Sequence, residues 1–388
     1  MVVQSSVDAV LEQAVATGAV PGVVALAADA RDVIYVGAFG RRGLDGPQPI
    51  TPDTILRIAS MTKLVTCVAA LQLVERDALS LDAPLGQLLP ALAAPQVLDG
   101  FADDGRPQLR PARRPITLRH LLTHTAGFGY HIWNAALNRY RQGGGAELTG
   151  KMATLGAPLV FDPGDGWEYG INIDWVGEAV EQASGRSLED YLQEQIFQPL
   201  GMHDTGFLLT PEREARVARL HRRHLDGSLT PVPPEPWRPP VFFAGGGGLY
   251  STGPDYLRFL QALLHGGTRD GVQILQPDSV AQLFANQIGD LAVPPFRTAV
   301  PALSNDGNFF PGMVKRWSLG GMLTTEAAST GRCAGSLSWC GLFNSYYWLD
   351  PTRRLTGVLS AQITPFFDPA VLDLAEQFEQ AIYAAHGA

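Results

Sequence analysis

The chain has 388 residues, which is enough to bury a sizeable core in one large body or in two domains. Hydrophobic residues make up 46% and charged residues 17% of it, a composition typical of globular proteins and not of disordered ones. The formal net charge of −9 argues against a nucleic-acid partner, because phosphate binding requires concentrated positive charge.

The N-terminal part predicts a helix followed by two strands. Residues 7–16 carry apolar side chains at helical spacing, and the valine-rich residues 20–30 are typical of a strand. A short polar connection at residues 30–32 leads into "VIYVGAFG", so we expect an antiparallel hairpin. No basic residue precedes the first apolar stretch, and no apolar run approaches the roughly 20 residues that cross a membrane. We therefore expect a cytoplasmic protein without a membrane segment.

The rest of the chain divides into a helical middle and a strand-rich end. Residues 117–206 have mostly helical patterns interrupted by glycine- and proline-rich loops, and the proline-rich residues 106–115 and 231–240 are expected to be ordered connections. Strand patterns return at residue 318, and a last helix is predicted from residue 369 to about residue 384. We predict one sheet domain formed by residues 1–85 and 243–388, and a mostly helical domain formed by residues 86–242.

A serine and a lysine stand out in the apolar segment "SMTKLVTCVAALQLV". Only three of the 29 basic residues are lysines, and Lys63 is one of them. Apolar residues recur at steps of three and four, which predicts an amphipathic helix that begins at Ser60 and packs into the interior. Ser60 and Lys63 then share one helical face, on which no carboxylate can pair with the lysine. Burial would lower the pKa of Lys63 and allow it to act as a base toward Ser60.

The alternative for this pair is purely structural. Ser60 would cap the helix, and the side chain of Lys63 would extend along it to water. A serine three residues before a lysine occurs by chance in many proteins, so this motif alone does not decide between the two interpretations.

Six motifs along the chain carry a family resemblance. They are "LRIASMTK", "LRHLLTHTAGFGY", "PGDGWEYGINIDWVGEAVEQASG", "IFQPLGMHDTGF", "GGGGLYSTGPDYLRF" and "GSLSWCG". Their succession resembles the serine β-lactamase-like superfamily, which includes class C β-lactamases, DD-peptidases and the family VIII carboxylesterases. It is most similar to the family VIII esterases, with related acyltransferases nearby. The resemblance implies an α/β (α+β) fold with an antiparallel sheet flanked by helices, a mostly helical domain beside it, and an active site between them.

The resemblance also implies roles for individual residues. Ser60 matches the nucleophile, Lys63 its partner, and Tyr169 the tyrosine that opens the Y-x-N motif of the family. The backbone N–H groups of Ser60 and Leu342 would form the oxyanion hole. The segment that contains Trp339 and Gly341 falls where lactamases carry Lys-Thr-Gly and where the esterases often carry Trp-Gly-Gly.

Two further residues are candidates for substrate contact. Tyr130 closes the motif "HTAGFGY" and is either a pocket wall or a packing residue. The asparagine of the family's Y-x-N motif would fall at Ile171, whereas Asn172 stands one position later, so a contact with an amide side chain of a substrate is in question.

These residue types fit acyl transfer through a covalent intermediate. A serine hydroxyl is a weak nucleophile until a base removes its proton, and that base would be the phenolate of Tyr169 or neutral Lys63; the sequence leaves both open. Penicillin-recognising members place a cation where this chain has Trp339, so uncharged esters are the expected substrates, unless Arg332 supplies a cation from a neighbouring turn.

The sequence thus predicts a serine hydrolase that cleaves short-chain carboxylic esters through an acyl-enzyme on Ser60. A β-lactamase or DD-peptidase, an acyltransferase on the same site, and a catalytically silent binding protein are the alternatives. No cofactor is expected, and no metal, because the histidines and the three cysteines lack metal-ligand spacing. The expected partner is a small-molecule ester, and the oligomeric state is not predicted.

Overall fold

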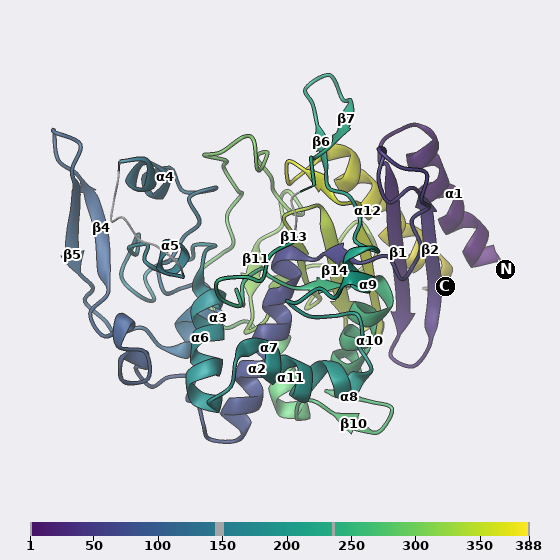
Figure 1. The fold of residues 1–388 in the computed structure, drawn as a ribbon. Helices are drawn as coiled ribbons and strands as arrows, with labels where there is room; N and C mark the ends of the chain where they lie inside the picture. The colour runs from purple at the N-terminus through teal and green to yellow at the C-terminus, as the bar shows by residue number, and fades with distance from the viewer. Residues whose placement is uncertain (1, 144–150, 235–236, 387–388) are drawn as a thin grey trace.

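A seven-stranded sheet forms the centre of the computed structural model, which describes residues 2–143, 151–234 and 237–386 (Figure 1). The strand order is β11-β12-β13-β14-β15-β1-β2, and every neighbouring pair is antiparallel. In chain order these strands are β1 (Gly22–Asp29), β2 (Val33–Gly40), β11 (Lys315–Trp317), β12 (Met322–Thr324), β13 (Leu337–Gly341), β14 (Ser345–Asp350) and β15 (Leu355–Ser360).

The two ends of the chain meet inside this sheet. Strand β1 pairs with its hairpin partner β2 on one side and with β15 on the other, with Ala25 opposite Leu359. The prediction of one sheet assembled from the N- and C-terminal parts is confirmed, and so is the N-terminal hairpin. All five residues of β13 and all six residues of β14 are buried, since helices cover both faces of the sheet.

Alternation along β14 assigns the helices to the two faces. Trp348 packs edge-on against Phe378 of α12 (Pro369–His386), with ring centroids 5.7 Å apart. The preceding residue, Tyr347, packs against Tyr256 of α10 (Gly253–Leu264) at 5.5 Å. Successive side chains of a strand point to opposite faces, so α12 covers one face and α10 the other. Helix α1 (Val2–Ala16) packs beside α12, and the two termini lie on the same side of the molecule (Figure 1).

A mostly helical region lies beside the sheet (Figure 1). Its helices, and those that connect it to the sheet, are α2 (Thr62–Glu75), α3 (Leu118–Leu122), α4 (Ala135–Gln142), α5 (Met152–Leu155), α6 (Asn172–Ser184), α7 (Leu188–Leu192), α8 (Gln198–Leu200), α9 (Pro211–Glu214) and α11 (Pro277–Leu283). Short 3₁₀ turns are η1 (Ala59–Met61), η2 (Leu85–Gln87) and η3 (Pro90–Leu92), and one π-helical turn, η4, spans Gln193–Phe197. Among the residues described, no helix is long and apolar enough to span a membrane.

Small sheets account for the remaining strands. They are β3 (Leu56–Arg57) with β8 (Tyr250–Ser251), β4 (Gln96–Phe101) with β5 (Pro107–Pro111), β9 (Thr268–Arg269) with β10 (Val272–Gln273), and β6 (His221–Arg223) between β7 (Leu229–Pro231) and β16 (Ile363–Thr364).

Residues 106–115 were expected to be an ordered connection, but part of this segment forms strand β5, which pairs with β4. Its two prolines stand at its ends, where a missing N–H costs the hairpin little. The side chain of Arg110 in this strand binds the carboxylate of Asp162 through two nitrogen atoms, which ties the hairpin to the helical region. The expected domain boundaries near residues 85 and 243 stay a prediction.

Candidate active site

The predicted nucleophile lies at the entrance to a helix that is buried on all sides. Ser60 is in turn η1, and α2 begins two residues later. We predicted an amphipathic helix, but residues 62–73 are all buried, polar ones included. The reason is tertiary packing: α6 and α7 cover α2, while η1 packs against β13 and β14. Ala59, just before Ser60, has a φ of 44°, which is unusual for a residue other than glycine and marks a sharp turn into the helix.

Lys63 points to Ser60 and not to water. Its Nζ atom lies 3.1 Å from Oγ of Ser60, 3.1 Å from the hydroxyl of Tyr130 and 2.6 Å from the carbonyl oxygen of Gly246, and the residue is only 2% exposed. An ammonium group donates three hydrogen bonds, so these acceptors satisfy the charged form. A neutral amine donates two and has a lone pair left, which can accept the proton of Ser60.

Burial disfavours the charged form of Lys63. Burial lowers the pKa of Lys63 to about 8, against the opposing effect of the Asp174 carboxylate. We predicted that no carboxylate shares the helical face of Lys63; that is true of α2 itself, but α6 supplies Asp174, which is 4% exposed. Burial also raises the pKa of Asp174, while Lys63 and the N–H of Gly246 favour its charged form.

Tyr169 stands on the other side of the nucleophile, in the loop before α6. Its hydroxyl accepts a hydrogen bond from Nε1 of Trp339 at 3.0 Å, and the side chain of Ser60 lies near enough to lower its pKa. Nζ of Lys63 lies 4.8 Å from the centre of its ring. Burial raises the pKa of Tyr169 above its ordinary value, although Ser60 and the hydrogen bond from Trp339 oppose the shift. The structure therefore brings the three predicted catalytic side chains together.

Strand β13 presents its last residues to the turn that carries Ser60. A Cβ atom on Gly341 would lie 2.4 Å from the carbonyl oxygen of Ile58, so only glycine allows this close approach. Leu342 follows in the turn to β14 and is half-buried. Its N–H belongs to the predicted oxyanion hole together with that of Ser60, and this role stays a prediction.

Tyr130 lies at the centre of the site. Its hydroxyl accepts a hydrogen bond from Lys63, its N–H donates to the carbonyl oxygen of Tyr169 at 3.1 Å, and the two tyrosine rings meet edge-on with centroids 5.3 Å apart. The residue is half-buried, and burial together with the nearby Asp174 carboxylate raises the pKa of its phenol. This phenol directly contacts the lysine, and a role of Tyr130 in binding substrate stays a prediction.

Asn172, which we considered as a candidate for substrate contact, lies at the start of a buried helix. It begins α6 and is fully buried, and its Nδ2 atom lies 2.9 Å from both the carbonyl oxygen of Phe128 and Nδ1 of His124. The amide nitrogen thus binds the protein itself, and a substrate contact of Asn172 stays a prediction.

Arg332 does not restore the cation that Trp339 replaces. It is 6% exposed, and its Nε atom lies 2.6 Å from Oε1 of Glu379 in α12, with a second hydrogen bond from Nη2 to Oε2. Its charge is therefore already paired. Trp339 is 4% exposed and directs its only N–H donor to Tyr169.

Two residues of the site, Gly246 and Asp174, were not singled out from the sequence. The carbonyl oxygen of Gly246 accepts from Lys63, and its N–H donates to Oδ1 of Asp174 at 2.9 Å. A Cβ atom at this position would lie 2.7 Å from Oδ2 of Asp174, whereas one on Gly247 would have no atom nearer than 3.9 Å. The run of four glycines was the available signal, since such a run marks a close backbone approach. Asp174 had none, because acids are common in the first turn of any helix.

A cavity of about 960 Å³ is lined by residues that lie close in the chain to those of the site, although Ser60, Lys63 and Tyr169 are not part of its described lining. It is lined by Gly248 from the glycine run, by Phe343, which follows Leu342, and by Arg57, three residues before Ser60. Further apolar and aromatic lining comes from Phe207, Leu209, Val217, Leu220, Val232, Trp237, Phe242 and Tyr250. Such a space admits a substrate of moderate size. Within the described part of the chain, no three His, Cys, Asp or Glu side chains are grouped so as to hold a metal ion.

Comparison with known proteins agrees with this geometry. The model of the β-lactamase family matches residues 7–381. Monacolin J acid methylbutanoyltransferase from Aspergillus terreus is 36% identical over 403 residues, covering 98% of this chain and 95% of that protein. Lovastatin esterase from Penicillium rubens is 34% identical over 408 residues, covering 98% of both. The solved structure of unliganded simvastatin synthase from Aspergillus terreus superimposes with a TM-score of 0.86 at 33% identity, covering 98% of this chain and 97% of that one. The resemblance and the predicted fold class are confirmed, and the chain belongs to the β-lactamase family.

Proposed function

We propose that this protein is a serine enzyme that takes a short acyl group from an uncharged ester onto Ser60 and passes it to water or to an alcohol. The observation that carries the proposal is the 3.1 Å distance between Oγ of Ser60 and Nζ of Lys63, a buried amine whose pKa is lowered to about 8 by that burial. A base in this state removes a serine proton near neutral pH.

The reaction has two steps that mirror each other. In the first, neutral Lys63 takes the proton of Ser60 while Oγ bonds to the carbonyl carbon of the ester; the carbon–oxygen bond to the alcohol then breaks, and the alcohol leaves with the proton held by Lys63. In the second, an acceptor hydroxyl gives its proton to Lys63 and attacks the acyl-enzyme. Ser60 leaves and recovers the proton, which returns the enzyme to its starting state.

The surroundings favour Lys63 over Tyr169 as the base. Burial lowers the pKa of the amine and raises the pKa of the phenol, so the same desolvation makes the neutral form of both groups more accessible. A neutral amine is a base, whereas a neutral phenol is a hydrogen-bond donor. Tyr169 therefore acts as a neutral phenol that orients Ser60 and relays the proton to the leaving oxygen.

Water and an alcohol are both proposed as acceptors. One relative is named as a methylbutanoyltransferase and another as an esterase, and both align with nearly the whole chain. The cavity of about 960 Å³ supports room for an organic acceptor beside the acyl group. The methylbutanoyl group in the first name supports a short acyl chain, for which a butyrate ester is a close substitute.

The test uses p-nitrophenyl butyrate with and without an added alcohol. We expect release of p-nitrophenol, a butyryl adduct on Ser60 by intact-protein mass spectrometry, and a new butyrate ester when the alcohol is present. Turnover by Ser60→Ala as fast as by wild type would overturn the proposal and would favour a silent binding protein on this scaffold. Butyric acid as the sole product across a series of alcohols would restrict the function to hydrolysis.

A β-lactamase is the second candidate, because the family model carries that name. The site favours it less. Trp339 stands where a carboxylate-binding cation is expected, and its indole N–H already donates to Tyr169. The charge of Arg332 is paired with that of Glu379. Ile171 stands where the family motif has an asparagine. We expect kcat/KM for nitrocefin to fall below that for p-nitrophenyl butyrate, and the reverse order would contradict this ranking.

A further inference from the structure

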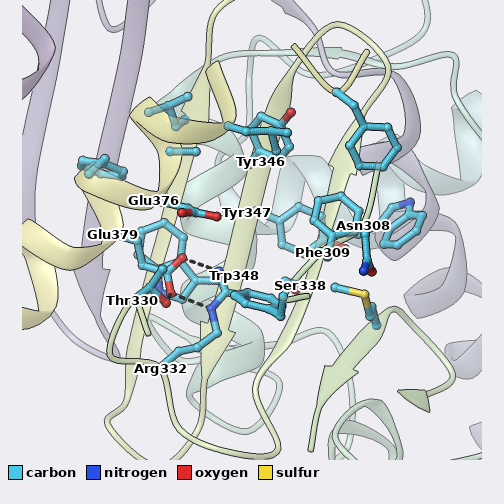
Figure 2. Close-up of a pocket in the computed structure, with 18 residues that line it drawn as sticks. Asn308, Phe309, Thr330, Arg332, Ser338, Tyr346, Tyr347, Trp348, Glu376 and Glu379 are labelled. Carbon is cyan, nitrogen blue, oxygen red and sulfur yellow. Dashed lines mark hydrogen bonds and ion pairs between the residues drawn. The ribbon is translucent and has the colours of Figure 1, made fainter. Parts of the chain in front are cut away.

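We propose that the protein has a second small-molecule site, between the sheet and α12, for a neutral ligand that combines a ring-sized apolar body with a hydrogen-bond acceptor. A cavity of about 100 Å³ lies there (Figure 2). Ser60, Lys63 and Tyr169 are not part of its described lining, and Trp339, whose indole donates to Tyr169, is the residue that it shares with the catalytic cluster. Its volume is of the order of cavities that hold benzene, about 150 Å³.

The walls of this cavity are aromatic. Trp348 of β14 pairs in register with Ser338 of β13, and both belong to the lining. Phe378 of α12 packs edge-on against Trp348. Phe309 and Phe310 come from the loop before β11 and complete the enclosure. Flat apolar walls of this kind favour a ring-shaped ligand.

Two buried donors of lining residues have no hydrogen-bond partner in the part of the chain that the structure describes. Arg332 binds Glu379 through Nε and Nη2, but its Nη1 atom has no hydrogen-bond partner, although the residue is only 6% exposed. Nε1 of Trp348 is likewise unpaired, and the guanidinium lies 5.8 Å from the centre of the indole (Figure 2). Leaving buried donors unpaired is costly, so a ligand oxygen that accepts from them gains affinity.

The charges around the cavity select a neutral acceptor. Glu379 already balances the charge of Arg332, and Glu376 adds a further exposed carboxylate among the lining residues. A ligand carboxylate would meet a net negative surrounding, whereas a ketone or ester oxygen accepts the same hydrogen bonds without repulsion. The site therefore fits an aromatic ketone better than an aromatic acid.

Three probes of similar size test this reasoning on the full-length protein. Acetophenone has the ring and the acceptor, ethylbenzene lacks the acceptor, and benzoate carries a charge. Dissociation constants are measured by ligand-observed saturation-transfer NMR. We expect acetophenone to bind about tenfold or more tightly than ethylbenzene, as one hydrogen bond to a charged donor predicts, and more tightly than benzoate. Equal binding of acetophenone and ethylbenzene, or tighter binding of benzoate, overturns the proposal.

Matched variants locate the site. Ala375 of α12 lines the cavity and is half-buried, whereas Ala384 of the same helix is exposed and is not part of the described lining. Ala375→Phe should fill part of the cavity and abolish the binding of acetophenone. Ala384→Phe should leave this binding unchanged. Trp348→Phe keeps a ring but removes one donor, so it should weaken the binding of acetophenone several-fold more than the binding of ethylbenzene. This variant tests the site if Ala375→Phe does not fold. Wild-type binding by both Ala375→Phe and Trp348→Phe shows that the probe sits elsewhere and refutes the site.

Discussion

The pH dependence of acylation follows from the buried state of Lys63. Burial holds the pKa of its ammonium at about 8, and the proposed mechanism requires the neutral amine. The neutral fraction is then about 9% at pH 7, about 50% at pH 8 and about 91% at pH 9. Because activity follows the deprotonated form, kcat/KM should rise about tenfold between pH 7 and pH 9 and level off above that. An ordinary lysine would still be rising at pH 10.

The assay is hydrolysis of p-nitrophenyl butyrate at low substrate concentration, followed in a pH-stat because p-nitrophenol itself titrates in this range. This leaving group departs without being protonated, so the profile reports the base alone, and kcat/KM reports the free enzyme. Spontaneous hydrolysis is subtracted with Ser60→Ala at each pH. A flat profile from pH 7 to pH 9 would refute neutral Lys63 as the base. A rise that begins only above pH 10 would favour the phenolate of Tyr169 instead.

Three substitutions test the site further. Lys63→Arg keeps the positive charge but cannot lose a proton at ordinary pH, so it should lose activity nearly as fully as Lys63→Ala; substantial activity in the arginine variant would make the lysine only an electrostatic helper. Tyr169→Phe should lower kcat by about 10²-fold if the phenol relays the proton, and a much smaller loss would leave the lysine to act alone. Gly246→Ala should lower kcat/KM by roughly tenfold to 10²-fold, because its methyl group would lie 2.7 Å from Asp174 and shift the backbone that holds the lysine. Gly247→Ala is the matched control and should retain activity, since its methyl group meets nothing nearer than 3.9 Å; equal losses in the two variants, at equal melting temperature, would contradict the role given to Gly246.

Several features of this protein could be determined from the sequence because local patterns specify them. The valine-rich run and the short polar connection predicted the hairpin of β1 and β2, and the structure has it at Gly22–Asp29 and Val33–Gly40. The last helix was expected from residue 369 to about 384 and spans Pro369–His386. Motif order identified Ser60, Lys63 and Tyr169, and the fold places them in contact. For the hairpin and the last helix the information lies in side-chain periodicity and in residues close together in the chain, whereas the three catalytic candidates came from the family resemblance.

Tertiary structure alone decided the features that depend on distant residues. Lys63 obtains its strongest hydrogen-bond acceptor from Gly246 and its neighbouring carboxylate from Asp174, both more than 100 positions away. The pairing of Arg332 with Glu379 likewise joins two segments that no local pattern connects. Apolar periodicity on α2 predicted a helix with one polar face, yet residues 62–73 are all buried. Burial is a property of everything packed around a residue, and it is this desolvation that turns an ordinary lysine into a base. The sequence by itself therefore determined which side chains could do chemistry, and the packed fold decided in which protonation state they do it.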